Sequence, residues 1–323
     1  MGSQMHFAVA SCMRNEAIFV LEWIAHQRLC GFRTIIIVTN DCTDGTDTIC
    51  DQIAASDPDF IHIRSTLGPE ESPQIKGMEQ VFELPVIGDV DYLLHCDSDE
   101  FLNIDVGKGQ VADLIAATGD ADCIALAWRP FGDAGNKRWA GGLVTENCMQ
   151  SAAVLRPSFT VHKSLFQPSR FQRATDHMPK APNAPDVSLV NTRGEPMPTA
   201  SLFHPRHARF RRTPPELFTW DNACIFHYAI RSEDVFLMKN NRGDGMGRET
   251  QRYHLNSKFW RRNNKNDVMV PVSLDRLSRI RRIVEDLREI QTIRSIEAKA
   301  LEDFIKISRA FLSPQKVDEL TIR

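Results

Sequence analysis

Residues 91–102 read DYLLHCDSDEFL, so an apolar run leads directly into a cluster of carboxylates. The apolar part is typical of a strand that is covered on both faces of a parallel sheet. In such sheets, ligands bind beyond the carboxyl ends of the strands. Asp97 and Asp99 follow the strand directly, and two carboxylates one residue apart can converge on one divalent cation. Their hard oxygens favour Mn²⁺ or Mg²⁺, and the position after a strand favours a metal site over a solvated turn.

Apolar strands and amphipathic helices alternate on the amino-terminal side of this stretch. We expect strands at residues 6–12, 34–38, 60–63 and 91–96, and helices over 18–29, through 49–53 and over 74–82. Asn15 stands where the first of these helices needs a cap, and Gly31 where it must stop. The alternation predicts an α/β fold with a mostly parallel, twisted sheet between helices. The polar turn 40–45 then falls at the same sheet edge as the carboxylates.

The regular alternation of predicted strands and helices ends at about residue 130. Residues 179–198 hold five prolines and are expected to form a surface loop. Apolar residues at helical spacing from Leu274 to Ile290 predict a long amphipathic helix, and a second helix should end at Phe311, before Pro314. We therefore expect a helical carboxy-terminal extension.

The chain has 323 residues, of which 42% are hydrophobic and 25% charged, the balance of a folded globular protein. Its net charge of −3 hides an asymmetry. Residues 1–130 carry 21 acidic and 7 basic side chains, whereas residues 131–323 carry 21 acidic and 32 basic ones. This division suits a metal site in the first half and an anionic partner for the second, although a basic surface without a partner is an equal alternative.

The eight cysteines are scattered, without a CxxC pair, and several lie in apolar runs. This usage favours a reducing cytoplasm over secretion and gives no clustered zinc ligands. No signal peptide and no apolar run of membrane-spanning length is visible. We expect a cytoplasmic protein, with peripheral contact to the inner face of a membrane left open.

Four ordered motifs make the chain resemble a bacterial branch of glycosyltransferase family 2, whose members have a GT-A fold and a DxDEF-type motif. These motifs are RNEA at 14–17, LEWIAH at 21–26, NDCTDGT at 40–46 and DSDEFL at 97–102. The similarity continues at residues 131–135, 142–144, 163–164, 177, 226–228, 232, 239 and 242–243. It covers about residues 6–245 and is less distinct beyond them.

The resemblance implies an enzyme that moves a hexose-type sugar from a nucleoside-diphosphate sugar to an acceptor hydroxyl, with inversion, during surface-glycan synthesis. The acceptor would be a polysaccharide, another glycan or a lipid-linked glycan. It also implies a nucleotide-sugar-binding half at residues 5–130 and an acceptor-binding half of the same GT-A domain at 131–245. Residues 246–323 would then be the helical extension.

The same resemblance assigns residues to the donor site. Asp97 and Asp99 would hold the Mn²⁺ or Mg²⁺ that bridges the two phosphates, with His227 as a third ligand. A histidine within the apolar run CIFHY is equally well a core residue. The further nucleotide-sugar-binding residues would be Arg14, Glu16, Asn40, Asp41, Asp44, Lys239 and Arg242.

Some of these donor residues have plainer interpretations. The family's turn begins with two acidic residues, where this chain has Thr39 and Asn40, so the nucleotide base is left open. Asp44 can equally serve as a turn and helix-cap residue. Lys239 and Arg242, on a predicted helix, could equally form a solvated face.

An inverting transferase needs one general base that takes the proton of the acceptor hydroxyl. Glu146 is our first candidate, because it follows the GLV motif at 142–144 beside a predicted strand. Asp133, in the loop 131–135, is the second, and Asp176 is a further acidic residue of this half. Each of them could equally be an ordinary surface carboxylate.

The segment 204–212, HPRHARFRR, is the densest basic stretch and could contact an anionic acceptor or an anionic membrane surface. A solvated loop is the plainer alternative. No nucleic-acid-binding module surrounds it, so we expect no nucleic-acid partner. Arginines between 279 and 288 could contact a membrane, but packing of their helix on the catalytic domain or on another subunit is favoured.

Two other functions are compatible with this sequence. One is a catalytically silent relative that binds a glycan or nucleotide, against which the intact Asp97–Asp99 pair argues. The other is a nucleotidyltransferase, which usually has a glycine-rich basic loop near its start. Residues 10–16, ASCMRNE, lack such a loop.

Overall fold

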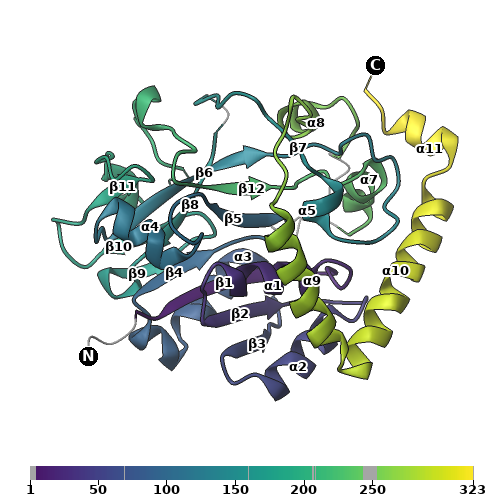
Figure 1. Ribbon diagram of the computed structural model, residues 1–323, viewed down its shortest axis with the longest axis horizontal. Coiled ribbons are helices and arrows are strands. Elements are labelled where there is room, and N and C mark those ends of the chain that lie inside the picture. The colour runs from purple at the N-terminus through teal and green to yellow at the C-terminus, as the bar shows by residue number, and fades with distance from the viewer. Residues whose placement is uncertain are drawn as a thin grey trace.

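A nine-stranded sheet forms the centre of the computed structural model, which describes residues 5–68, 70–158, 160–205, 207, 209–242 and 253–322 (Figure 1). Its strands are β1 (Phe7–Met13), β2 (Thr34–Thr39), β3 (Phe60–Arg64), β4 (Tyr92–His95), β5 (Glu100–Ile104), β6 (Cys123–Pro130), β8 (His162–Phe166), β11 (Leu189–Asn191) and β12 (Ala223–His227). They lie in the order β3-β2-β1-β4-β8-β6-β12-β5, and β11 pairs with β6. Smaller pairs join β7 (Gln150–Ser151) to β13 (Val268–Met269) and β9 (Phe171–Ala174) to β10 (Pro179–Pro182).

The sheet is mostly parallel, as the sequence predicts. β3, β2, β1 and β4 run in one direction, and β11 and β12 run parallel to β6. β8 runs antiparallel to both β4 and β6, and β5 runs antiparallel to β12. Because β8 runs against its neighbours, its first residues lie toward the carboxyl end of β4. The turn between β4 and β5 therefore meets the start of β8 and the end of β12 at one edge.

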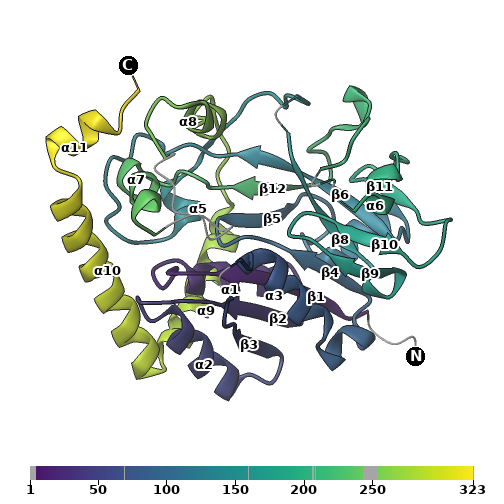
Figure 2. The same cartoon turned by 180° about the vertical axis from the view of Figure 1, so that it is seen from behind.

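Helices cover both faces of this sheet (Figures 1 and 2). They are α1 (Val20–Leu29), α2 (Thr46–Ser56), α3 (Pro73–Phe82), α4 (Val111–Thr118), α5 (Val144–Asn147), α6 (Ala200–Phe203), α7 (Glu233–Arg242), α8 (Lys258–Asn263), α9 (Leu274–Arg288), α10 (Gln291–Phe311) and α11 (Pro314–Glu319). Short 3-10 helices cover Pro85–Asp89, Pro168–Arg170 and Pro215–Leu217. The strands and helices predicted before residue 100 are all present, so this part of the fold is confirmed.

Each face of the sheet has its own hydrophobic core, because successive side chains of a strand point to opposite faces. In β1, Phe7 and Val9 pack with residues of α1, α2, α4 and α9. Ala8 and Ala10 belong instead to the core that contains residues of α3 and β9. Burial on both faces is the physical reason that these strands read as continuous apolar runs.

The carboxy-terminal helices pack on the α/β part of the chain. Leu277, Ile280 and Val284 of α9 are buried, and α9 contacts α1. α10 runs along one side of the molecule (Figure 2) and contacts α2. There the Ile296 side chain occupies the space that a Cβ on Gly45 would need, and Gly45 has a φ of +88°. The start of α2 therefore requires glycine, while the expected boundary between residues 245 and 246 lies outside the described residues.

Two local expectations are wrong. Asn15 does not cap α1, which begins five residues later at Val20. Asn15 instead has a φ of 57°, and its Oδ1 accepts a hydrogen bond from the Thr43 amide at 2.8 Å. Asparagine tolerates this left-handed conformation, so its side chain links two loops at the sheet edge.

Residues 179–198 do not form a surface loop. They contain β10 and β11, with Lys180 fully buried and Leu189 2% exposed. β11 pairs along one side of β6. Prolines are compatible with strands that are short or at an edge, so the proline content of this segment is misleading.

Lys180 gives a prediction about stability and pH. Its ammonium donates to the carbonyl oxygens of Ser201 and His207 in a buried position. Burial, with a smaller effect of Arg173, lowers the pKa of Lys180 to about 8 from its ordinary value of 10.5. Between these two pH values the unfolded chain binds more protons than the folded chain, so the free energy of unfolding should rise with pH.

We expect this contribution to reach about 3 kcal/mol between about pH 8 and pH 10.5. Urea denaturation of the parent and of Lys180→Met across that range measures it, because other titrating groups cancel in the difference. The variant should lack the rise. Parallel stability profiles for the two proteins would contradict the prediction.

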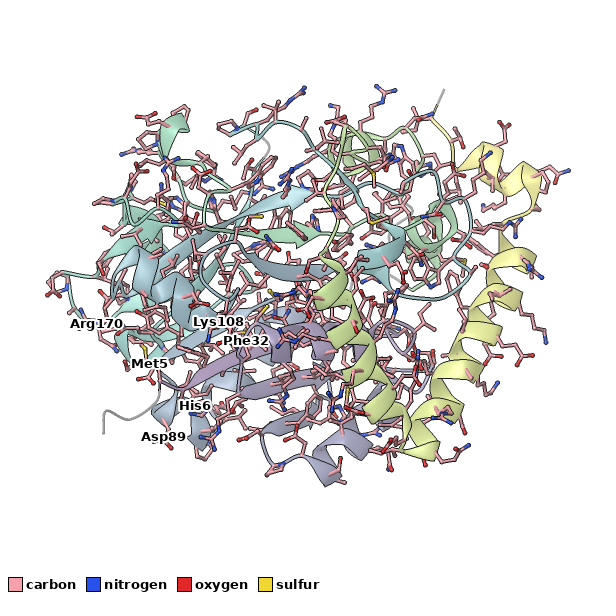
Figure 3. The ribbon with its side chains drawn as sticks, in the orientation of Figure 1. Met5, His6, Phe32, Asp89, Lys108 and Arg170 are labelled. Carbon is pink, nitrogen blue, oxygen red and sulfur yellow. The ribbon has the colours of Figure 1, made fainter. Side chains whose placement is uncertain are left out.

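Within the described residues, no helix is both long enough and apolar enough to span a bilayer. Met5 and His6, which precede β1, lie at the far side of the molecule from α10 (Figure 3). β1 therefore runs toward the side on which α10 lies, and its carboxyl end is on that side.

Candidate active site

The turn between β4 and β5 is held through its backbone. The indole Nε1 of Trp23, on α1, donates to the carbonyl oxygens of Asp97 and Glu100, both at 3.1 Å. The Arg231 guanidinium donates to the carbonyl of Ser98 at 2.8 Å. Because these donors come from separate segments, the carboxylates of the turn project from a fixed backbone.

A buried lysine pairs with the first carboxylate of the turn. The Nζ of Lys163, at the start of β8, lies 3.0 Å from Oδ2 of Asp97 and 3.2 Å from Oε2 of Glu100. It also donates to the carbonyl oxygen of Asp176 at 2.7 Å. The Lys163 and Glu100 side chains are completely buried. One ammonium thus serves two carboxyl groups in a water-poor environment.

The second carboxylate of the turn faces a different lysine and a histidine. The Nζ of Lys239, on α7, lies 3.1 Å from Oδ2 of Asp99 and donates to the carbonyl of Ala229 at 2.8 Å. The Nε2 of His227, at the end of β12, lies 3.8 Å from Oδ1 of Asp99. The Trp128 ring stacks on His227 with a centroid separation of 4.0 Å.

These surroundings separate the pKa values of the neighbouring carboxyl groups. Burial opposes ionisation of Asp97, but the Lys163 ammonium and His95 outweigh it and hold the pKa of Asp97 below its usual value. Burial is outweighed in the same way at Asp99, whose pKa Lys239 and His227 lower strongly.

Burial and the two aspartates instead raise the pKa of Glu100 well above its usual value, although Lys163 opposes this shift. The turn therefore presents two carboxyl groups whose pKa values are shifted toward the anionic form and one whose pKa is shifted toward the protonated form. Burial lowers the pKa of His227 to about 4, so its imidazole is neutral.

A cavity of about 200 Å³ opens over the turn. It brings together these predicted site residues: Arg14, Glu16, Asp97, Asp99, His227 and Lys239. Cys12, Gln74, Trp128, Tyr253 and Phe259 are also among its lining residues. Carboxylates, cationic groups and one imidazole thus meet at the carboxyl ends of β1, β4 and β12.

The other predicted donor residues lie apart from this cavity. Asp44 lines a neighbouring cavity of about 220 Å³ against α10, which Lys239 also borders. Its carboxylate accepts hydrogen bonds from the amides of Ala17 and Thr46, the first residue of α2. Asp44 thus holds the turn at the start of this helix, as in the plainer of its two interpretations. Asn40 donates to Asp41 at 3.0 Å, and neither residue lines these cavities. The side chain of Arg242 lies outside the described part of the structure.

The two candidate bases are engaged elsewhere. Glu146 lies on the short helix α5, shortly before β7, and forms an ion pair with Arg281 of α9. The buried Asp133 accepts hydrogen bonds from the side-chain amides of Asn264 at 3.1 Å and Asn266 at 3.0 Å. Neither residue lines the 200 Å³ cavity.

Sequence reasoning missed two cations near the turn. Lys163 was part of a family motif but had no assigned role, and its place in that motif is the signal that could have revealed it. It lies in β8, HKSLF, whose five residues are all buried. Arg231 had no such signal. Its guanidinium pairs with Glu16 at 3.1 Å, although the two residues are 215 positions apart.

Within the part of the chain that the structure describes, no three Asp, Glu, His or Cys side chains form a ready metal centre. Asp97 and Asp99 each give one oxygen to a lysine. The second oxygen of Asp97 accepts a hydrogen bond from Gln74 at 3.0 Å. A cation entering the cavity would therefore bind carboxylates that already have protein partners.

No protein-family model matches the chain, and a comparison with curated proteins finds no match. Among solved structures, it is similar to the mannosyltransferase PcManGT from Pyrobaculum calidifontis in complex with GDP-Man and Mn²⁺. That alignment has 14% identity and a TM-score of 0.29, and it covers 38% of this chain and 36% of the mannosyltransferase. The chain thus spans little more than a third of that protein.

Two further alignments cover a larger share of the solved structures that they match. TarS 1–349 from S. aureus, in complex with UDP, aligns at 14% identity over 95% of this chain and 73% of that chain, with a TM-score of 0.31. A 4-diphosphocytidyl-2C-methyl-D-erythritol synthase aligns at 15% identity over 53% of this chain and 78% of that chain, with a TM-score of 0.31.

Proposed function

We propose that the protein is a GT-A-type glycosyltransferase that moves a sugar from a nucleoside-diphosphate sugar to an acceptor hydroxyl during surface-glycan synthesis. One observation carries the proposal. Asp97 and Asp99 line a single cavity with Arg14 and Lys239 at the carboxyl ends of the strands. Anionic groups for a cation and cationic groups for phosphate oxygens are both present where ligands of parallel sheets bind.

The donor atoms of this cavity fit Mn²⁺ or Mg²⁺. Asp97 and Asp99 supply hard carboxylate oxygens that are ionised at neutral pH, and His227 is neutral and faces Asp99. When bound there, the cation would neutralise the diphosphate and stabilise the charge that develops as it leaves. The metal is part of the proposal, with Asp97, Asp99 and His227 as its ligands.

The chain's own residues would orient the donor and keep the site rigid. Arg14 and Lys239 would contact phosphate oxygens, and Arg242 would follow Lys239 along α7. Glu16 and the turn that holds Asn40, Asp41 and Asp44 would border the nucleoside. Trp23 and Arg231 fix the backbone of the carboxylate turn, and this pre-organisation lowers the cost of reaching the reactive geometry.

In the transfer step, the acceptor oxygen forms a bond to the anomeric carbon as the bond from that carbon to the diphosphate breaks. A base takes the hydroxyl proton, and attack from the opposite side inverts the configuration. Glu146 and Asp133 remain the predicted bases. Either one must leave its present partners before it can accept that proton.

A thermal-shift and calorimetric panel of nucleoside diphosphates and nucleotide sugars, with and without Mn²⁺, tests the proposal. Stabilisation by one nucleotide only when Mn²⁺ is present would support it and identify the donor base. Donor hydrolysis separates a transferase from a silent relative, and pyrophosphate release from a nucleoside triphosphate would identify a nucleotidyltransferase. No response to any nucleotide would overturn the proposal. The eight free thiols support a reducing, cytoplasmic location.

A further inference from the structure

A second cavity, of about 620 Å³, lies next to the one over the carboxylate turn. Trp128 lines both cavities, so the second opens directly beside the proposed donor site. Its walls come from the end of β6, the segment after β7, and α8 with the residues that follow it. This size is sufficient for a sugar ring with a charged substituent.

The lining of the second cavity is strongly basic. Arg156, Lys258, Arg261 and Lys265 line it, and Asp267 is its one acidic residue among those described. Within the described chain, no carboxylate lies within 4.0 Å of the charged groups of these four cations. Asp267 accepts a hydrogen bond from the amide of Ala153 at 3.2 Å instead. Among the described residues, these four cations therefore form a group of positive charges without a carboxylate partner.

A fifth basic residue belongs to the wall of the same cavity. Arg262 also lines the cavity, and its pKa is lowered by burial and by the nearby guanidinium of Arg209. Arg209 belongs to the basic segment 204–212, so at least this residue of the segment acts on the cavity. The four cations Arg156, Lys258, Arg261 and Lys265 repel one another, and an anionic ligand would relieve that repulsion.

Two indole rings add an apolar wall. Trp220 donates from its Nε1 to the carbonyl of Trp128 at 3.0 Å, and the Arg129 guanidinium lies 4.6 Å from the centre of the Trp220 ring. Both tryptophans line the cavity. A flat aromatic face can cover the apolar face of a pyranose ring, while the cations bind its charged substituent.

We propose that this cavity is the acceptor site and that its ligand is a saccharide with an anionic substituent, either a phosphate or a carboxylate. This inference rests on the proposed transferase function, since it takes the adjoining cavity as the donor site. Trp128 then separates donor from acceptor, with one face toward His227. The charge of the second cavity selects the acceptor, because an anionic substituent can pair with Arg156, Lys258, Arg261 and Lys265, whereas a neutral saccharide cannot.

Isothermal titration with glucose 6-phosphate, glucuronate and glucose tests the inference. We expect at least one anion to bind, with affinity reduced about tenfold when NaCl is raised from about 20 mM to about 500 mM, and glucose not to bind. Binding of the phosphate alone would indicate a phosphorylated acceptor, and binding of glucuronate alone a uronic acid. Binding of neither anion, or equal binding of glucose, would overturn the inference.

A paired substitution keeps the test specific. Lys258→Gln with Arg261→Gln removes two exposed charges of the cavity, and Arg282→Gln removes one exposed charge from α9 as the control. The double variant should lose anion binding about tenfold or more, whereas the control should retain it. Anion binding that persists unchanged in the double variant would overturn the inference. Nucleotide binding with Mn²⁺ should be the same in all three proteins, and its absence from the parent would overturn the donor site separately.

Discussion

Asp99→Ala is expected to abolish sugar transfer, with a fall in kcat/KM of about 10³-fold or more. The carboxylate lies between Lys239, at 3.1 Å, and His227, at 3.8 Å, in the cavity assigned to the donor. Its removal takes away a proposed metal ligand. It also leaves the Lys239 ammonium with the carbonyl of Ala229 as its remaining described partner, so the charge of the cavity changes sign locally.

Three measurements separate this effect from misfolding. Transfer is assayed with the donor that the nucleotide panel identifies, donor affinity is measured with and without Mn²⁺, and the free energy of unfolding is measured in urea. Asp99→Asn retains an oxygen for Lys239 but not the charge, so it should fold like the parent and remain inactive. Asp286→Ala, at an exposed position of α9, is the matched control. Full turnover in Asp99→Ala, or metal-independent turnover of the parent, would remove the central mechanism.

The sequence predicts the sheet well because local patterns determine it. A strand that is buried on both faces must be apolar throughout, so β1, β2 and β4 are visible as runs of apolar residues. The position of Asp97 and Asp99 follows from the same rule, since they come directly after β4. Their meeting in one cavity with Arg14 follows from the parallel arrangement of β1 and β4.

The partners of these carboxylates depend on topology that no local pattern encodes. Lys163 reaches Asp97 because β8 is inserted antiparallel between β4 and β6, 66 positions further along the chain. Arg231 reaches Glu16 across an even larger separation. Proline content is an equally local signal, and it gave the wrong result at β11, where pairing with β6 decides the structure. Long-range ion pairs of this kind must be read from the fold.

Lys163→Met is expected to lower the free energy of unfolding by about 3–5 kcal/mol at pH 7. The parent ammonium is fully buried and pairs with Asp97 at 3.0 Å and Glu100 at 3.2 Å. Methionine fills a similar volume but leaves the partly buried Asp97 carboxylate and the fully buried Glu100 carboxyl group without their cation. The cost arises mainly from that unpaired charge, because desolvation of an ionised group is expensive.

The pH dependence identifies this cause. In the parent, Lys163 helps to hold the pKa of Asp97 below its unfolded value, so the pair stabilises the fold above that value and less as the pH falls. In Lys163→Met, burial without the ammonium should raise the pKa of the same carboxyl group above its unfolded value. The variant should then bind protons on folding, and its deficit relative to the parent should shrink as the pH is lowered from 7 toward about 4. A deficit that is independent of pH would indicate lost packing instead.

A double variant distinguishes support of the fold from a part in the reaction. Lys163→Met with Asp97→Asn removes both charges of the Lys163–Asp97 pair, and the pKa of Glu100 is already shifted toward its neutral form. The double variant should therefore recover most of the stability. Transfer should nevertheless stay abolished, since the amide cannot replace the Asp97 carboxylate at the metal. Recovery of both stability and transfer would show that Asp97 has only a structural role and would leave Asp99 as the sole essential carboxylate. Recovery of stability alone would assign Lys163 to holding Asp97 ionised and in place, which is the state that binding of a cation requires.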